Sequence, residues 1–156
     1  MNNPRVESLK VILLVEDDSR DVELTLTAME EANLAQRVTV VGDGEQALDY
    51  LYCRGDFEKR TRGDPILVLL DLKMPKIGGL EVLKIIKSDT DLKKIPVVVL
   101  SSSREATDLV ECYQCGVNAF VVKPVDFSQF MKAVKQLGEF WVTLNEPLPL
   151  VRQTSF

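Results

Sequence analysis

The segment Pro65-Ile-Leu-Val-Leu-Leu-Asp71 carries five consecutive apolar residues after its proline and ends in a carboxylate. A strand that is apolar at consecutive positions is covered on both faces, as in a parallel sheet between two layers of helices. The sequence therefore predicts a buried strand at Ile66–Leu70. Similar runs predict four more strands, at Lys10–Val15, Arg37–Val41, Ile95–Leu100 and Ala119–Val122.

Amphipathic segments alternate with these apolar runs. Helical spacing predicts five helices, from Asp18 or Ser19 to about Asn33 and over Gly44–Tyr52, Gly79–Lys87, Arg104–Cys115 and Asp126–Thr143. Their predicted core positions are Val22, Leu26, Met29, Ala47, Leu48, Leu51, Leu80, Leu83, Ile86, Ala106, Leu109, Val110, Tyr113, Phe127, Phe130, Met131, Val134, Leu137 and Trp141. Alternating strands and helices form right-handed βαβ units, so the fold class is α/β, a doubly wound five-stranded parallel sheet with five helices. We expect one domain over residues 9–143 and a C-terminal tail over 144–156.

The composition excludes several classes of protein. The chain has 156 residues, 46% of them hydrophobic, which suits one globular domain with a proper core. A net charge of −5 argues against nucleic-acid binding, which needs a basic surface. Because the sequence contains no histidine, a Ser-His-Asp triad and a His-ligated zinc site are excluded. The sequence has neither an apolar run that could cross a membrane nor the apolar start of a signal peptide, so we expect a cytoplasmic protein.

Two polar features of the sequence, the cysteines and one charged run, are expected to have no chemical role. Cys53, Cys112 and Cys115 should be reduced thiols in a cytoplasmic protein. Cys112 and Cys115 have C-x-x-C spacing, but they fall late in a predicted helix, where thiolates are not stabilised. The long polar link Cys53–Asp64 contains the mixed-charge run Glu58–Arg62, which we expect to be solvated.

Acidic side chains gather where the predicted strands end. Glu16, Asp17 and Asp18 follow the first strand, and Asp71 follows the third. In this architecture ligands bind beyond the carboxyl ends of the strands. The loop after the first strand has no glycine to cradle a phosphate, and clustered carboxylates attract a hard cation such as Mg²⁺. Asp18 also suits a helix cap, but capping leaves Glu16 and Asp17 unexplained. We therefore expect Mg²⁺ beside a carboxylate that can act as a nucleophile.

Two more polar residues are predicted at this edge. Lys123 follows the fifth strand, and Ser101 ends the fourth strand with a hydroxyl. The Lys123 ammonium can pair with Asp71 or with a phosphoryl group carried on it. Since proline follows, the Lys123–Pro124 peptide bond is a candidate for the cis form.

Six motifs thus stand in order along the chain: Glu16-Asp17, Asp71, Met74-Pro75, Gly79, Ser101 and Lys123-Pro124. Together they resemble the receiver domain of two-component response regulators, over about residues 9–142. The resemblance implies a flavodoxin-like fold of the receiver type. It also implies a phosphoacceptor signalling protein and not an enzyme, beyond self-phosphorylation and self-dephosphorylation.

The resemblance implies a role for each residue of the edge. Asp71 would accept a phosphoryl group from a phosphohistidine on a sensor histidine kinase or a phosphotransfer protein. Asp17 and Asp71 would hold Mg²⁺ with the backbone carbonyl of Lys73, and Glu16 would act mainly through water. Lys123 would pair with the phosphoryl oxygens, because charge neutralisation carries phosphoryl transfer.

The resemblance also implies a switch. Ser101 would hydrogen-bond to the phosphoryl group in the active state and draw its loop inward. Phe120 stands at the position of the switch aromatic, but it lacks the hydroxyl of the common tyrosine. The side chain of Lys73 would bring a cation near the phosphoryl group and alter its hydrolysis.

The Cys53–Asp64 link, the Phe140-Trp141 pair and the proline-containing tail resemble the single-domain regulators that partner cyanobacterial and bacterial phytochromes. Too few residues follow Thr143 for an effector domain, so we expect output through protein contacts. A second apolar row on the last helix predicts a homodimer seam on the fourth and fifth helices, or else a cap on the same subunit. The residues of the row and its flank are Ala133, Leu137, Phe140, Leu144, Leu148, Leu150 and Val151.

Three other functions are weighed against this one. A phosphatase of the haloacid dehalogenase type also uses an aspartate nucleophile and Mg²⁺, but it needs a second aspartate where this chain has Lys73. A flavodoxin-like electron carrier needs a first loop that cradles phosphate, which the acids deny. A scaffold that no longer accepts phosphate would not need the complete set of edge residues.

Overall fold

The computed structural model describes residues 10–149, and its five parallel strands form one sheet in the order β2-β1-β3-β4-β5. The strands are β1 (Ile12–Val15), β2 (Val38–Val41), β3 (Leu67–Leu70), β4 (Val97–Ser101) and β5 (Ala119–Val122). The helices are α2 (Ser19–Glu31), α3 (Gly44–Tyr52), α4 (Gly79–Ser88), α5 (Ala106–Gln114) and α6 (Phe127–Glu139). Short 3₁₀ segments lie at η1 (Ala35–Arg37) and η2 (Gly55–Phe57), and a π-helical segment, η3 (Phe140–Leu144), follows α6. The predicted fold class is confirmed.

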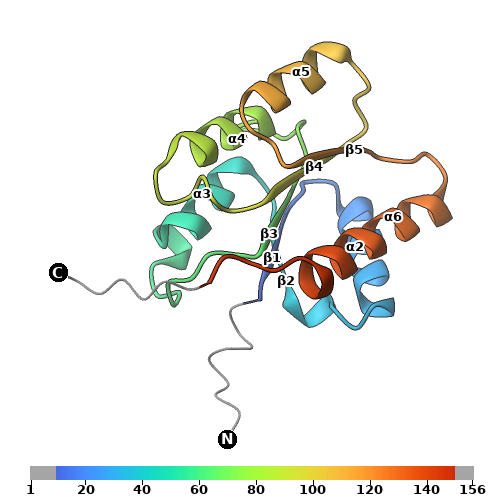
Figure 1. Cartoon of the computed structure of the whole chain (residues 1–156), viewed down its shortest axis with the longest axis horizontal. Coiled ribbons are helices and arrows are strands. Elements are labelled where there is room, and N and C mark those ends of the chain that lie inside the picture. Colours follow the sequence, from blue (N-terminus) through green and yellow to red (C-terminus); the bar gives the residue numbers. More distant parts are fainter. Residues whose placement is uncertain (1–9, 150–156) are drawn as a thin grey trace, which may run out of the picture.

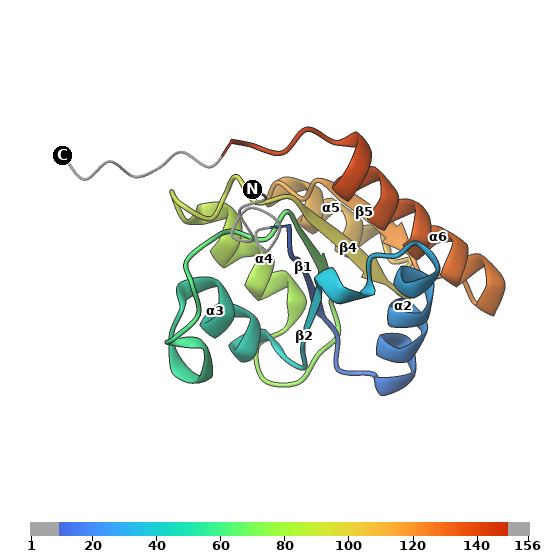
Figure 2. The ribbon, with the colours of Figure 1, turned by 90° about the horizontal axis from the view of Figure 1, so that it is seen from below.

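Helices cover both faces of the sheet (Figure 1). One core lies between the sheet and α3, α4 and α5, and the other lies between the sheet and α2 and α6. Figure 2 shows α2 and α6 side by side, and Gly138 of α6 lets them approach closely, since a Cβ there would lie 2.7 Å from the Met29 sulfur. No helix within residues 10–149 is long and apolar enough to cross a membrane.

The strand register sets the position of the functional edge. Val15 of β1 pairs with both Val41 and Leu70, and β1 is therefore flanked on both sides by parallel neighbours. Glu16 and Asp71 come directly after Val15 and Leu70, so two carboxylates emerge next to each other. All five strands are parallel, and the polar residues that follow β1, β3 and β5 meet at this same edge.

Three predicted core positions on α5 are wrong, because the helix is rotated and leaves Ala106, Val110 and Tyr113 exposed. Cys112 is buried, whereas Val110 is 52% exposed and Tyr113 is 56% exposed. The Ser103 hydroxyl donates to Asp108 in the first turn at 2.5 Å, which ties α5 to the β4–α5 loop in this orientation. Phe127, at the start of α6, is also 60% exposed, contrary to prediction. The remaining apolar stripe of α6 faces the core, with Phe130 and Val134 buried.

The Cys53–Asp64 link is more ordered than its polar sequence predicted. Phe57 packs edge-on against Tyr50, and the Arg60 guanidinium stacks on the Tyr50 ring at 4.0 Å. Arg60 Nε also donates to the Tyr50 carbonyl, so this charge is not simply solvated.

The structure also tests the predictions for the Lys123–Pro124 bond and for the end of the last helix. No peptide bond among the described residues is cis, so the candidate Lys123–Pro124 bond is trans. The last helix is α-helical to Glu139 and π-helical over η3, where a continuous helix to Thr143 was predicted. Leu150 and Val151 lie outside the described residues.

Candidate functional site

Three carboxylates converge at the carboxyl edge of the sheet. Glu16, Asp17 and Asp71 each offer one ligand atom, and these atoms lie within 4.8 Å of one another. The backbone holds two of the three in place, because Glu16 N–H donates to Val41 O and Asp71 N–H donates to Val15 O, both at 3.1 Å. Asp17 is exposed, whereas Glu16 and Asp71 are buried. The fold therefore brings Glu16, Asp17 and Asp71 together at one edge, as the sequence predicted.

Lys123 lies inside this acidic edge. Its Nζ donates to Glu16 Oε2 and to Asp21 Oδ2, both at 2.8 Å, and lies 3.5 Å from Asp71 Oδ2. The Lys123 side chain is only 10% exposed, so solvent screens these pairs little. The pairing of Lys123 with Asp71 was predicted, and the shorter contact to Asp21 was not.

Burial and charge shift the ionisation of this cluster. Burial raises the pKa of Glu16 to about 7, although the Lys123 ammonium opposes the shift. For Lys123 burial acts to lower the pKa, but hydrogen bonds to Asp21 and Glu16 and the charge of Asp71 outweigh it and raise the pKa above its ordinary value. The lysine thus stays an ammonium, whereas burial brings the titration of Glu16 near neutral pH in the metal-free protein.

The loop after β3 is packed tightly against Asp71. The Lys73 N–H points at Asp71 Oδ1 over 3.4 Å, and the Gly79 N–H donates to Leu72 O at 2.9 Å. A Cβ on Gly79 would lie 2.0 Å from Asp71 O and 2.6 Å from Leu72 Cα, so no other residue fits there without a backbone shift. Glycine at 79 therefore lets the loop fold back beside the carboxylate cluster.

Ser101 is at the predicted edge, but its hydroxyl is engaged elsewhere. The side chain is fully buried, and Ser101 Oγ accepts a hydrogen bond from Ser103 N–H at 3.2 Å. Lys123 N–H donates to Ser101 O at 2.7 Å, which ties the ends of β4 and β5 together. Phe120 is half-buried and packs against the core on the α3–α5 side of the sheet.

Asp21 is the residue of this edge that the sequence analysis missed. It lies in the first turn of α2, where an acidic residue is ordinarily explained by the helix dipole. The signal that was available is its position, five residues after Glu16 on the helix that starts at the same edge.

The donor set fits a hard divalent cation. The three converging groups are all carboxylates, and oxygen donors suit Mg²⁺ and related ions. Among residues 10–149 they form the one group of three acidic or thiol side chains close enough to share an ion. Asp71 also lies 3.5 Å from the Lys123 ammonium, so a cation held by these acids would share the Asp71 carboxylate with Lys123.

Comparison with known proteins gives a consistent family. The sequence model of the response regulator receiver domain matches residues 12–135. The response regulator Rcp1 of Synechocystis sp. (strain ATCC 27184 / PCC 6803 / Kazusa) is 38% identical over 133 residues, which cover 85% of this chain and 89% of Rcp1. The crystal structure of the Mn²⁺-bound form of Rcp1 has a TM-score of 0.83 at 36% identity and covers 90% of this chain and 99% of that chain.

Two further solved structures are similar. The phosphorylated cyanobacterial phytochrome response regulator RcpA has a TM-score of 0.83 at 40% identity, over 90% of this chain and 99% of that chain. The bacteriophytochrome response regulator RtBRR has a TM-score of 0.72 at 59% identity, over 90% of this chain and 85% of that chain.

Proposed function

Because the chain belongs to the response regulator receiver family, we propose that Asp71 accepts a phosphoryl group from a phosphohistidine on a sensor histidine kinase in the cytoplasm. The observation that carries the proposal is the meeting of Asp71 with two other carboxylates within 4.8 Å and with the Lys123 ammonium at 3.5 Å. A receiver domain of this family is a signalling module with a divalent-metal site in its acidic pocket. Mg²⁺ is the ion we propose for this chain.

The chain's residues divide the work of the transfer. Asp17, Asp71 and the backbone carbonyl of Lys73 would hold Mg²⁺, with Glu16 acting mainly through water, and the ion would neutralise charge on the transferring group. An Asp71 oxygen attacks phosphorus while the bond from phosphorus to the histidine nitrogen breaks. Lys123 neutralises further charge, which is what phosphoryl transfer needs from a protein. The same residues would support self-phosphorylation from a small acyl phosphate and self-dephosphorylation.

The output is a change of shape at β4. An aspartyl phosphate adds about −1.5 to −2 charges and strong acceptors beside Ser101. We expect the Ser101 hydroxyl to exchange its contact with Ser103 N–H for a phosphoryl oxygen, which draws the β4–α5 loop inward. Phe120 then occupies the space that the loop leaves.

The proposed phosphodonor is a phytochrome-type histidine kinase. RcpA is described as a cyanobacterial phytochrome response regulator and RtBRR as a bacteriophytochrome response regulator, at 40% and 59% identity. The alignment covers 99% of the RcpA chain in that structure, and the output we propose for this chain is through protein contacts. The assignment is tested by measuring the rate of phosphotransfer to this chain from such a kinase and from an unrelated histidine kinase. The ratio of the two rates is the result of the test.

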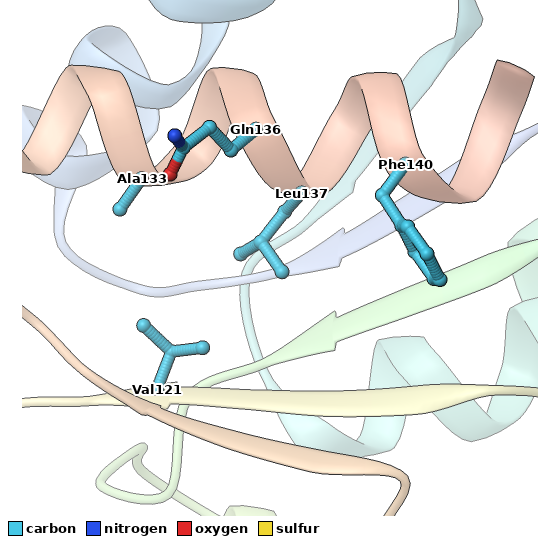
Figure 3. Close-up of a pocket in the computed structure, with 5 residues that line it drawn as sticks. All are labelled: Val121, Ala133, Gln136, Leu137 and Phe140. Atoms are coloured by element: carbon cyan, nitrogen blue, oxygen red, sulfur yellow. The ribbon is translucent and has the colours of Figure 1, made fainter. Parts of the chain in front are cut away.

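A homodimer through α5 and α6 is the proposed assembly. The outer row of α6 and η3 leaves Phe140 45% exposed and Leu144 77% exposed, and α5 exposes Val110 and Tyr113. A groove of about 230 Å³ lies between β5 and the α6–η3 segment. Figure 3 shows the residues that line it, which are Val121, Ala133, Gln136, Leu137 and Phe140. Sedimentation equilibrium that finds a monomer at all concentrations, with and without acetyl phosphate, would refute the dimer.

The phosphoacceptor role is tested by intact mass. We expect the native chain to gain one phosphoryl group after incubation with acetyl phosphate and Mg²⁺, and the Asp71→Asn variant to gain none. Asp56→Asn, in the exposed η2 segment, removes the same charge away from the edge and should behave as the native chain does. Equal labelling of native protein and Asp71→Asn would refute the proposal.

A further inference from the structure

The ammonium of Lys123 is shared among three carboxylates, and two of them hold it more closely than the proposed phosphoacceptor does. Nζ lies 2.8 Å from Glu16 Oε2, 2.8 Å from Asp21 Oδ2 and 3.5 Å from Asp71 Oδ2. Hydrogen bonds of Lys123 are found with Glu16 and Asp21. An ammonium has three donors, so two of the three are already engaged before a phosphoryl group arrives.

The position of Asp21 is fixed by the start of α2. Asp18 caps this helix, and its Oδ1 accepts hydrogen bonds from the backbone N–H groups of Arg20 at 2.9 Å and Asp21 at 3.2 Å. The capped first turn holds the Asp21 backbone, and the Asp21 side chain, 24% exposed, reaches Lys123 from the side of the sheet edge. Asp21 is therefore an ion-pair partner of Lys123 whose position is fixed by the helix cap, and not a loosely solvated acid.

The charge of Asp21 works against the proposed chemistry. A phosphoryl group on Asp71 brings negative charge next to Lys123, and the stabilisation it gains depends on how much of the lysine's positive charge is unopposed. Glu16 belongs to the metal cluster, whereas Asp21 is not one of its three acids. Asp21 thus adds a further carboxylate that competes with Asp71 for the Lys123 ammonium.

We propose that Asp21 is a positioning residue that holds Lys123 at the carboxyl edge of the sheet. Its charge limits the stabilisation that the lysine gives to a phosphoryl group on Asp71. The inference rests on the proposed phosphoacceptor function of Asp71. It predicts that removing the charge of Asp21, with its shape preserved, makes phosphorylation more favourable and not less.

The test compares Asp21→Asn with native protein in two measurements on the full chain. Beryllofluoride with Mg²⁺ is the probe for a bound phosphoryl group, and its affinity is followed by ¹⁹F NMR. We expect an affinity gain of about five-fold in the variant, as for the loss of a competing, partly exposed ion pair, with a matching rise in the rate of labelling by acetyl phosphate. In metal-free protein, the ¹⁵N chemical shift of Lys123 Nζ should change in the variant, because one of its two hydrogen-bonded carboxylates is lost.

Glu23→Gln is the matched control. It removes the same charge two residues further along α2, from an exposed side chain that is not among the carboxylate partners of Lys123. We expect the control to leave beryllofluoride affinity and the Lys123 signal close to native. Asp21→Ser is a second variant that removes the charge with a different side chain, in case Asp21→Asn is poorly folded.

The outcomes separate the inference from the function on which it rests. If native protein takes up neither beryllofluoride nor a phosphoryl group, the proposed function falls and the inference falls with it. If native protein takes up both and the Asp21 variants match Glu23→Gln or bind beryllofluoride more weakly, the inference alone is overturned.

Discussion

Gly79→Ala should displace the loop that carries the site and destabilise the fold, whereas Gly78→Ala should not. A Cβ at Gly79 would lie 2.0 Å from Asp71 O, 2.6 Å from Leu72 Cα and 2.8 Å from Asp71 C, where ordinary contact begins at 3.4 Å. All three atoms are backbone, so the loop must move by more than an ångström. Overpacking of this kind costs about 1–3 kcal/mol. We therefore expect the urea midpoint of unfolding to fall by about 1 M.

The neighbouring glycine is the control for this prediction. A Cβ at Gly78 would meet only Leu72 O, at an ordinary 3.7 Å, and the φ of −70° at Gly78 suits any residue. Gly78→Ala should therefore keep native stability. Because the loop moves against Asp71, Gly79→Ala should also weaken Mg²⁺ binding, measured by calorimetry. The reasoning is refuted if the two variants unfold at the same urea concentration and bind Mg²⁺ equally well.

Three further predictions concern the charges of the edge. Lys123→Met leaves buried Glu16 without its partner and should cost about 3–5 kcal/mol in urea unfolding at pH 8; a loss below about 1 kcal/mol would contradict the ion-pair geometry. Burial raises the pKa of Glu16 from 4.5 to about 7 in the metal-free folded protein. The contribution of Glu16 to the free energy of unfolding is therefore fully present below pH 4.5, and it is lost as the pH rises through 7. Mg²⁺ displaces the Glu16 proton, so its affinity should fall by about ten-fold per pH unit below 7, and calorimetry that finds it constant from pH 6 to 8 would be contrary. Saturating Mg²⁺ at about 100 times its Kd should stabilise the native chain by about 2.7 kcal/mol, and Asp17→Asn should lose this gain in thermal unfolding.

The three central strands of the sheet, β1, β3 and β4, were predictable because they carry runs of consecutive apolar residues. Ile12–Val15, Leu67–Leu70 and Val97–Ser101 are buried throughout, and a strand covered on both faces leaves no other pattern. The acids and Lys123 were predictable for a related reason, since parallel strands deliver the residues after them to one edge. Glu16, Asp17 and Asp71 meet there as the sequence indicated.

The features that were mispredicted depend on tertiary contacts between distant segments. The apolar spacing of α5 permits more than one orientation, and the Ser103–Asp108 hydrogen bond, which spacing does not reveal, accompanies the rotation that exposes Val110. The sequence predicts that Arg60 is a solvated charge, whereas in the fold its guanidinium lies over the Tyr50 ring. Asp21 meets Lys123 across 102 residues of sequence, so only the folded edge shows that the two are partners.

The most direct test of the account is to locate the phosphoryl group on the chain. Native protein is labelled with acetyl phosphate, with and without Mg²⁺, and then treated with borohydride, which reduces an acyl phosphate to an alcohol that survives proteolysis. Peptide mass spectrometry should find the reduced side chain at position 71 and only when Mg²⁺ was present. A reduced residue at another carboxylate, or equal labelling of Asp71 after the metal is chelated, would contradict the claim that this edge recruits a cation to phosphorylate Asp71.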